Sequence, residues 1–72
     1  MKSGELRRFF DDMGYETEEA GKTFLVVEVT DEYVTVLQDN AITQLQTSKP
    51  AGSAFSRYEW VLGYSEVISE SR

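Results

Sequence analysis

The first hydrophobic pattern lies near the N-terminus, between residues 3 and 13. Its apolar residues are spaced i, i+3, i+4 and i+7, which places them on one side of an α-helix: Leu6, Phe9, Phe10 and Met13. Ser3 is a suitable N-cap residue, and Gly14 is a suitable residue after the last turn. The pattern predicts an amphipathic helix over about residues 3–13, which must pack against another element because so short a helix is marginal alone.

The middle of the chain has the pattern of β-strands. Residues 23–30 and 33–38 are rich in β-branched and aromatic side chains and are separated by only two residues, a spacing typical of a hairpin. Asp39-Asn40 is a second turn signal. Residues 41–47 are more polar, which predicts a third, weaker strand at the edge of a sheet.

The C-terminal part of the chain is more ambiguous. Residues 48–53 read as a surface loop because they contain Pro, Gly and Ser. Residues 55–64 alternate between large apolar and polar side chains, which predicts a strand, with a helix as the competing interpretation. Val67 and Ile68 predict a short last strand, and residues 69–72 are expected to fray.

These elements predict an α+β fold in a single small domain over residues 1–72. The N-terminal helix would pack on a small antiparallel sheet of three to five strands, because the connections are too short for parallel crossovers. The sheet would be either open or a partial SH3-like or OB-like barrel. We expect the following core: Leu6, Phe9, Phe10, Leu25, Val27, Val34, Val36, Trp60 and Leu62.

The composition narrows the chemistry. The 72 residues include no cysteine and no histidine, so thiol nucleophiles, imidazole bases and the usual zinc, haem and iron–sulfur ligands are missing. Residues 11–16 have oxygen ligands but lack the spacing of a calcium-binding loop. We therefore expect a protein that is not an enzyme and that has no cofactor and no metal.

The sequence also bears on the location of the protein. The longest apolar run, residues 24–27, is too short to span a membrane, and the N-terminal residues do not have the pattern of a secretory signal. We therefore expect no membrane partner and a cytoplasmic location.

Charge is distributed unevenly along the chain. Residues 1–40 contain ten acidic and four basic residues, whereas residues 41–72 contain three of each, so the net charge of −6 belongs to the first part. Five of these acids crowd into nine positions without a base: Asp11, Asp12, Glu16, Glu18 and Glu19. They are either solvated surface that keeps a small protein soluble or the binding site for a basic protein partner.

An aromatic group is the second candidate site. On a strand, Tyr58, Trp60 and Tyr64 would share one face, and exposed aromatic side chains on a sheet can stack on unpaired bases. Few basic residues accompany them, although phosphate contacts supply most of the affinity in nucleic-acid binding. The pattern therefore favours a role in the core over nucleic-acid binding.

The leading hypothesis is a small acidic module, interaction or regulatory in role, that acts by protein–protein contact. In its sharper form the protein inhibits a basic, nucleic-acid-binding target. The alternatives are a single-stranded nucleic-acid-binding module that uses the aromatic face, and a structural subunit of a larger assembly. A second copy of the chain is another candidate partner, so a homodimer is a further hypothesis. It is favoured by a small core without disulfides and by residues 42–47, which could form an unpaired strand edge.

Overall fold

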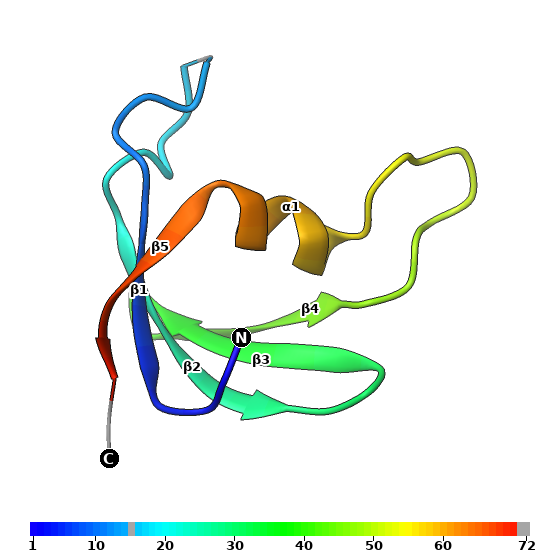
Figure 1. Ribbon diagram of the computed structural model, residues 1–72, viewed down its shortest axis with the longest axis horizontal. Coiled ribbons are helices and arrows are strands. Elements are labelled where there is room, and N and C mark those ends of the chain that lie inside the picture. Colours follow the sequence, from blue (N-terminus) through cyan, green and yellow to red (C-terminus); the bar gives the residue numbers. More distant parts are fainter. Residues whose placement is uncertain (15, 71–72) are drawn as a thin grey trace.

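The computed structural model describes residues 1–14 and 16–70. Within these residues the chain forms five strands and one short helix (Figure 1). The elements in chain order are β1 (Glu5–Phe9), β2 (Thr23–Val29), β3 (Tyr33–Gln38), β4 (Ala41–Gln46), α1 (Arg57–Gly63) and β5 (Ser65–Glu70).

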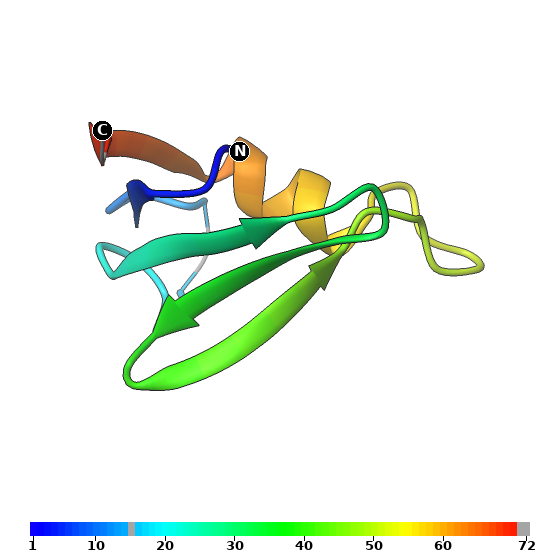
Figure 2. The same ribbon diagram turned by 90° about the horizontal axis from the view of Figure 1, so that it is seen from below.

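All strand pairs are antiparallel, and the five strands lie side by side in the order β4-β3-β2-β1-β5. Helix α1 contacts both edge strands, β4 and β5, and lies on one face of the twisted sheet (Figures 1 and 2). We call this covered side the inner face and the opposite side the outer face. No pairing joins β4 to β5 within the described residues.

The predicted N-terminal helix is wrong, and with it the fold class of a helix at residues 3–13 packed on a sheet. Over residues 1–14 and 16–70 the chain is mostly antiparallel sheet, with one short helix near the C-terminal end. Residues 5–9 form strand β1, in which Glu5, Arg7 and Phe9 are buried and alternate with half-buried Leu6 and Arg8. Two charged residues therefore occupy buried positions, which hides the alternation from a pattern analysis that expects charges outside.

The predicted strand at residues 55–64 is also wrong, and the competing helix is correct. Ser56 is the N-cap of α1: its hydroxyl accepts a hydrogen bond from the backbone N–H of Glu59 at 3.1 Å. The Glu59 carboxylate in turn accepts the Ser56 backbone N–H at 3.1 Å. This reciprocal arrangement is a capping box, and its Ser-x-x-Glu signature is visible in the sequence.

The other predicted strands are confirmed as β2, β3, β4 and β5. Asp39 and Asn40 both have positive φ, 52° and 63°, as the two central residues of a type I′ hairpin turn require. Ser69 and Glu70 belong to β5, and residues 71–72 lie outside the described residues, so the fraying predicted for them stays a prediction. No helix in the described part of the chain is long and apolar enough to cross a membrane.

The core lies between the inner face and α1. Its buried apolar residues are Phe9, Met13, Phe24, Val26, Val34, Val36, Leu45 and Val61. Of the nine predicted core residues, the structure confirms Phe9, Val34 and Val36. Leu6 and Trp60 are only half-buried. Four of the predictions are wrong because these side chains are exposed: Phe10, Leu25, Val27 and Leu62.

Candidate functional site

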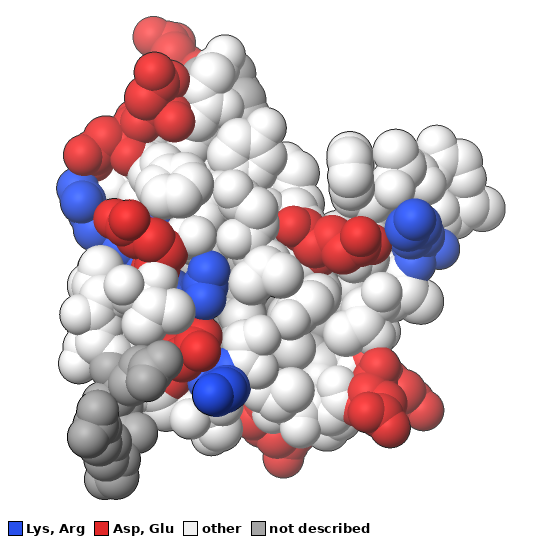
Figure 3. Space-filling view, in the orientation of Figure 1, with Lys and Arg blue, Asp and Glu red and all other residues white. Residues whose placement is uncertain are grey.

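All five predicted acidic residues lie on the loop between β1 and β2, and four of them line one hollow. An open hollow of about 740 Å³ is lined there by Asp11, Asp12, Glu16 and Glu18, with buried Met13 among its apolar lining. We call these four carboxylates and their hollow the acidic hollow. Figure 3 shows acidic side chains gathered over this loop at the upper left of the view.

The loop is held at its base by Arg8 and Gly21. The Arg8 guanidinium donates hydrogen bonds to the Gly21 carbonyl at 3.3 Å and to the Asp11 carboxylate at 2.7 Å. Gly21 has a φ of 77°, and a Cβ placed there would lie 2.9 Å from the Asp11 carboxylate. Glycine therefore satisfies both the backbone conformation and the close approach of Asp11.

The carboxylates of the acidic hollow differ in their partners. Asp11 forms the salt bridge with Arg8, and Asp12 accepts a hydrogen bond from the Gly14 backbone N–H at 3.0 Å. Among the described residues, Glu16 and Glu18 take part in no salt bridge. The hollow therefore presents four carboxylates and one arginine that offsets part of their charge.

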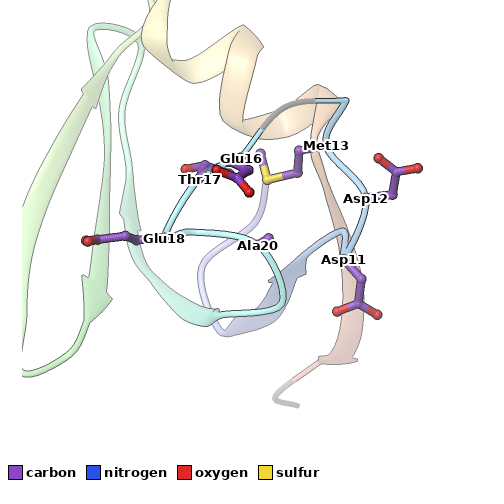
Figure 4. Close-up of a pocket in the computed structure, with 7 residues that line it drawn as sticks. All are labelled: Asp11, Asp12, Met13, Glu16, Thr17, Glu18 and Ala20. Carbon is purple, nitrogen blue, oxygen red and sulfur yellow. The ribbon is translucent and has the colours of Figure 1, made fainter.

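These carboxylates point apart rather than toward a common centre. In Figure 4, Asp11 and Asp12 extend to one side of the loop and Glu18 extends to the opposite side. Within residues 1–14 and 16–70, no group of three or more acidic side chains is placed to hold a metal ion. Divergent carboxylates suit contact with a broad basic surface better than chelation of one small cation.

Glu19, the fifth predicted acid, is not part of this group. Its carboxylate forms a salt bridge of 3.2 Å with Arg57 at the start of α1, so it connects the β1–β2 loop to the helix. Two hydrogen bonds within the loop hold the backbone around Glu19: its backbone N–H donates to the Thr17 hydroxyl at 3.3 Å, and the Lys22 N–H donates to the Glu19 carbonyl at 3.0 Å.

The predicted aromatic strand face does not form, because Tyr58 and Trp60 lie in α1 and Tyr64 is its C-cap residue. Trp60 packs against the core: its ring centroid is 6.3 Å from that of Phe9 and 5.0 Å from that of Tyr64. The Arg57 guanidinium lies 4.7 Å from the Trp60 ring centroid. The aromatic group therefore joins α1 to the sheet instead of forming a sheet surface.

Sequence reasoning missed a buried polar network around Arg7. The guanidinium is 3.1 Å from the Glu5 carboxylate and donates to the hydroxyl and the carbonyl of Ser65, each at 3.0 Å. The Ser65 hydroxyl donates to the Val61 carbonyl at 2.7 Å. The network connects β1 to the end of α1 and the start of β5, and no local pattern could indicate it because Arg7 and Ser65 are 58 residues apart.

A second missed feature is a small cavity of about 120 Å³ on the inner face, with Glu19 and Arg57 among its lining residues. The side-chain Nε2 of Gln38, another lining residue, is buried and has no hydrogen-bond partner among the described residues. No sequence signal indicates such a cavity, because its walls come from segments that are distant in the chain.

Two ionisable side chains outside the acidic hollow have shifted pKa values. The hydrogen bond from the Tyr33 hydroxyl to Glu28, at 3.2 Å, raises the pKa of Tyr33 because it favours the protonated phenol. The hydrogen bond from the Ser56 backbone N–H lowers the pKa of Glu59 because it favours the carboxylate. Both shifts belong to structural contacts, in a hairpin and a helix cap.

Comparison with known proteins found no matching family model, no similar curated protein and no similar solved structure. Function is therefore inferred from the chemistry of the chain's own residues.

Proposed function

We propose that this chain is a non-enzymatic interaction module that acts by protein–protein contact, and that the acidic hollow meets a basic surface of its partner. The observation that carries the proposal is the grouping of Asp11, Asp12, Glu16 and Glu18 on one exposed loop, where only Asp11 has a basic residue paired with it in the described chain. Opposite charges accelerate association and make it sensitive to salt.

In its sharper form the target is a nucleic-acid-binding protein, and the acidic hollow occupies the surface that otherwise contacts phosphates. The support is the concentration of acids: the net charge of −6 comes from residues 1–40. Separate carboxylates on a loop present several negative charges at once, as a nucleic-acid backbone does. Binding of the module would then compete with nucleic acid for the same basic residues.

The test uses a partner retrieved by the wild-type protein from its host lysate. A triple variant, Asp12→Lys with Glu16→Lys and Glu18→Lys, reverses the charge of the hollow but leaves the Arg8–Asp11 salt bridge in place. A matched control, Asp31→Lys with Glu32→Lys and Glu66→Lys, makes the same change in net charge on other exposed elements. The association rate should fall about tenfold or more for the first variant and less than about threefold for the control.

Salt provides the second arm of this test. Raising the salt concentration from about 50 to about 500 mM shortens the screening length from roughly 14 to roughly 4 Å, so wild-type association should slow as well. Competition by single-stranded or duplex nucleic acid would identify the target's surface. Equal rates for the triple variant and its control, without salt dependence, would contradict the proposal.

A homodimer is the second candidate, and one specific observation favours it. Four aliphatic side chains form a continuous line across the outer face, because each is the cross-strand neighbour of the next: Leu6, Leu25, Leu37 and Ile42. Two copies could bury this line against each other. Sedimentation at roughly tens of micromolar should show a mass near twice 8.2 kDa, and Leu37→Lys should return it to the monomer value. A wild-type mass that stays at 8.2 kDa would rule out the dimer.

The remaining hypotheses from the sequence gain no support. A single-stranded nucleic-acid-binding function depended on a strand face that Tyr58, Trp60 and Tyr64 do not form. No observation among the described residues favours a structural subunit over a regulatory module.

A further inference from the structure

The cavity on the inner face has the features of a binding site. Its walls are mostly core side chains: Phe9, Phe24, Val36, Leu45 and Val61. Two polar side chains also line it, Gln38 from β3 and Thr43 from β4. Glu19 and Arg57, whose salt bridge is partly exposed to solvent, complete the lining.

Gln38 is the anomaly in this cavity. Its Nε2 is a hydrogen-bond donor that is buried and lacks an acceptor among the described residues, whereas nearly all buried polar groups in folded proteins have a partner. An unpaired buried donor costs free energy. The Nε2 atom itself is shielded in the free protein, so an oxygen acceptor in the cavity would remove this cost once the Gln38 amide turned toward it.

The size of the cavity limits what can fill it. Pockets for cofactors and drug-sized ligands measure roughly 300–1,000 Å³, so a volume of about 120 Å³ is too small for them. An apolar cavity of about 150 Å³ is known to bind a group as small as benzene. The cavity therefore suits one small aliphatic side chain.

The neighbouring edge of the sheet can supply such a side chain. β4 is an edge strand with the sequence Ala-Ile-Thr-Gln-Leu-Gln. It contains no charged residue and no proline, and its pairing with β3 shows no bulge, although natural edge strands usually carry one of these protections. Thr43 and Leu45 of this same strand line the cavity. An extended segment added to β4 would therefore place alternate side chains beside the cavity.

We propose that β4 and the adjoining cavity bind an extended peptide segment of a partner protein by strand addition. A valine, leucine or isoleucine side chain of the segment enters the cavity, and the Gln38 amide turns so that its Nε2 donates a hydrogen bond to an oxygen of the segment. Main-chain hydrogen bonds along β4 supply affinity and the cavity supplies specificity. This site is independent of the acidic hollow.

A second copy of the chain fits this site poorly. On β4 the residues that face the inner side are Ala41, Thr43 and Leu45, and Leu45 is already buried in its own core. Ile42 is 69 % exposed, but it pairs with Leu37 on the outer face. Antiparallel pairing of two β4 strands would therefore bring no free valine, leucine or isoleucine side chain to the cavity.

The probe for the test is a phage-displayed library of random peptides of about nine residues, selected on the full chain. Selected peptides should share one branched aliphatic residue at a fixed position. Thr43→Leu fills the cavity and should weaken peptide binding about tenfold or more. Gln44→Leu is the matched control, because it adds the same side chain one residue further along β4 on the outer face, and it should change affinity less than about twofold.

Two further readouts separate strand addition from other modes of binding. Hydrogen exchange should show that bound peptide protects alternate backbone amides of β4. Gln38→Leu should weaken binding about fivefold or more without lowering the melting temperature, because the donor that it removes has no partner among the residues that the structure describes.

The proposal is overturned if selection yields no peptide that binds the full chain, if Thr43→Leu and Gln44→Leu bind the selected peptides equally, or if protection appears away from β4. Protection of β4 amides that rises with protein concentration alone would also overturn it, because a second copy would then occupy the edge. The Asp12, Glu16 and Glu18 charge-reversal variant should bind the peptides within about threefold of wild type. Loss of binding in that variant would assign the peptides to the acidic hollow instead.

Discussion

On β2, large apolar side chains point to both faces of the sheet. Phe24 and Val26 point to the inner face and are 2 % and 1 % exposed, whereas Leu25 and Val27 are 37 % and 43 % exposed. The two pairs are similarly hydrophobic, so hydrophobicity alone does not decide which pair is buried. The position of α1 decides it, because the helix covers the face that carries Phe24 and Val26. The two faces can therefore be compared residue by residue in their contributions to stability.

The largest difference between the faces should appear in a pair of neighbouring substitutions. Phe24→Ala removes a buried ring that packs against Phe9 at a centroid distance of 5.1 Å and should cost about 3–5 kcal/mol, enough to unfold much of a small domain. Leu25→Ala on the outer face should cost about 1 kcal/mol or less. Urea denaturation measures both, and equal costs would contradict the assignment of the covered face.

A second comparison uses the two arginines of β1. Arg7→Ala leaves the Glu5 carboxylate buried without its ion-pair partner and should cost about 3 kcal/mol. Arg8→Ala removes a partly exposed salt bridge with Asp11 and should cost less than about 1 kcal/mol. The double variant Arg7→Met with Glu5→Leu tests the cause: it should recover most of the loss, because no buried charge remains. Failure to recover would show that the hydrogen bonds to Ser65 dominate.

A third prediction concerns the helix that creates the difference between the faces. Ser56→Ala removes the hydroxyl that accepts the Glu59 N–H and should destabilise the protein by about 1 kcal/mol. Ser53→Ala, in the exposed loop before α1, serves as the control and should change stability by less than about 0.5 kcal/mol. The measurement is the midpoint of thermal or urea unfolding for both variants.

The smallest predicted effect is a pH dependence at the same cap. The pKa of Glu59 is lowered from its ordinary value of 4.5 in the folded protein, so its contribution to stability is fully present above that value and is lost as the pH falls through the folded-state pKa. Glu59→Gln keeps the cap geometry without a charge. The variant should be slightly less stable than wild type at pH 7, and the difference should vanish in acid. A difference that stays constant with pH would refute this role.

The parts of the fold that the sequence predicts are local. β2, β3 and β4 follow one another through short turns, and residues such as Asp39 and Asn40 signal the turn directly. β1 could not be predicted in this way, because it pairs with β2 and with the distant β5 and buries Glu5 and Arg7. For α1 a local signal existed in Ser56 and Glu59, but the alternation of the aromatic residues outweighed it.

The candidate site likewise has features that nearby residues predict and features that depend on distant residues. The acids of the hollow are close in sequence, so their grouping on one loop was predictable, and their binding role stays a proposal. The separation of Glu19 from this group depends on Arg57, 38 residues away, and could not be predicted from the loop. The cavity beside Gln38 and the free edge of β4 depend on strand order and on the placement of α1, which no local pattern specifies.

The network around Arg7 has a consequence for the order in which the protein can fold. Strands β2 to β4 can pair as soon as they are synthesised, because their contacts are between neighbouring segments. The contact between Arg7 and Ser65 must close a loop of 58 residues, which carries a larger entropic cost than the hairpins, and such long-range contacts form late and slowly. Until α1 and β5 emerge from the ribosome, no helix packs on the inner face and Arg7 lacks its hydrogen-bond partner Ser65. The nascent sheet therefore exposes apolar side chains on both faces, and only the inner face is covered once α1 packs on it and β5 pairs with β1.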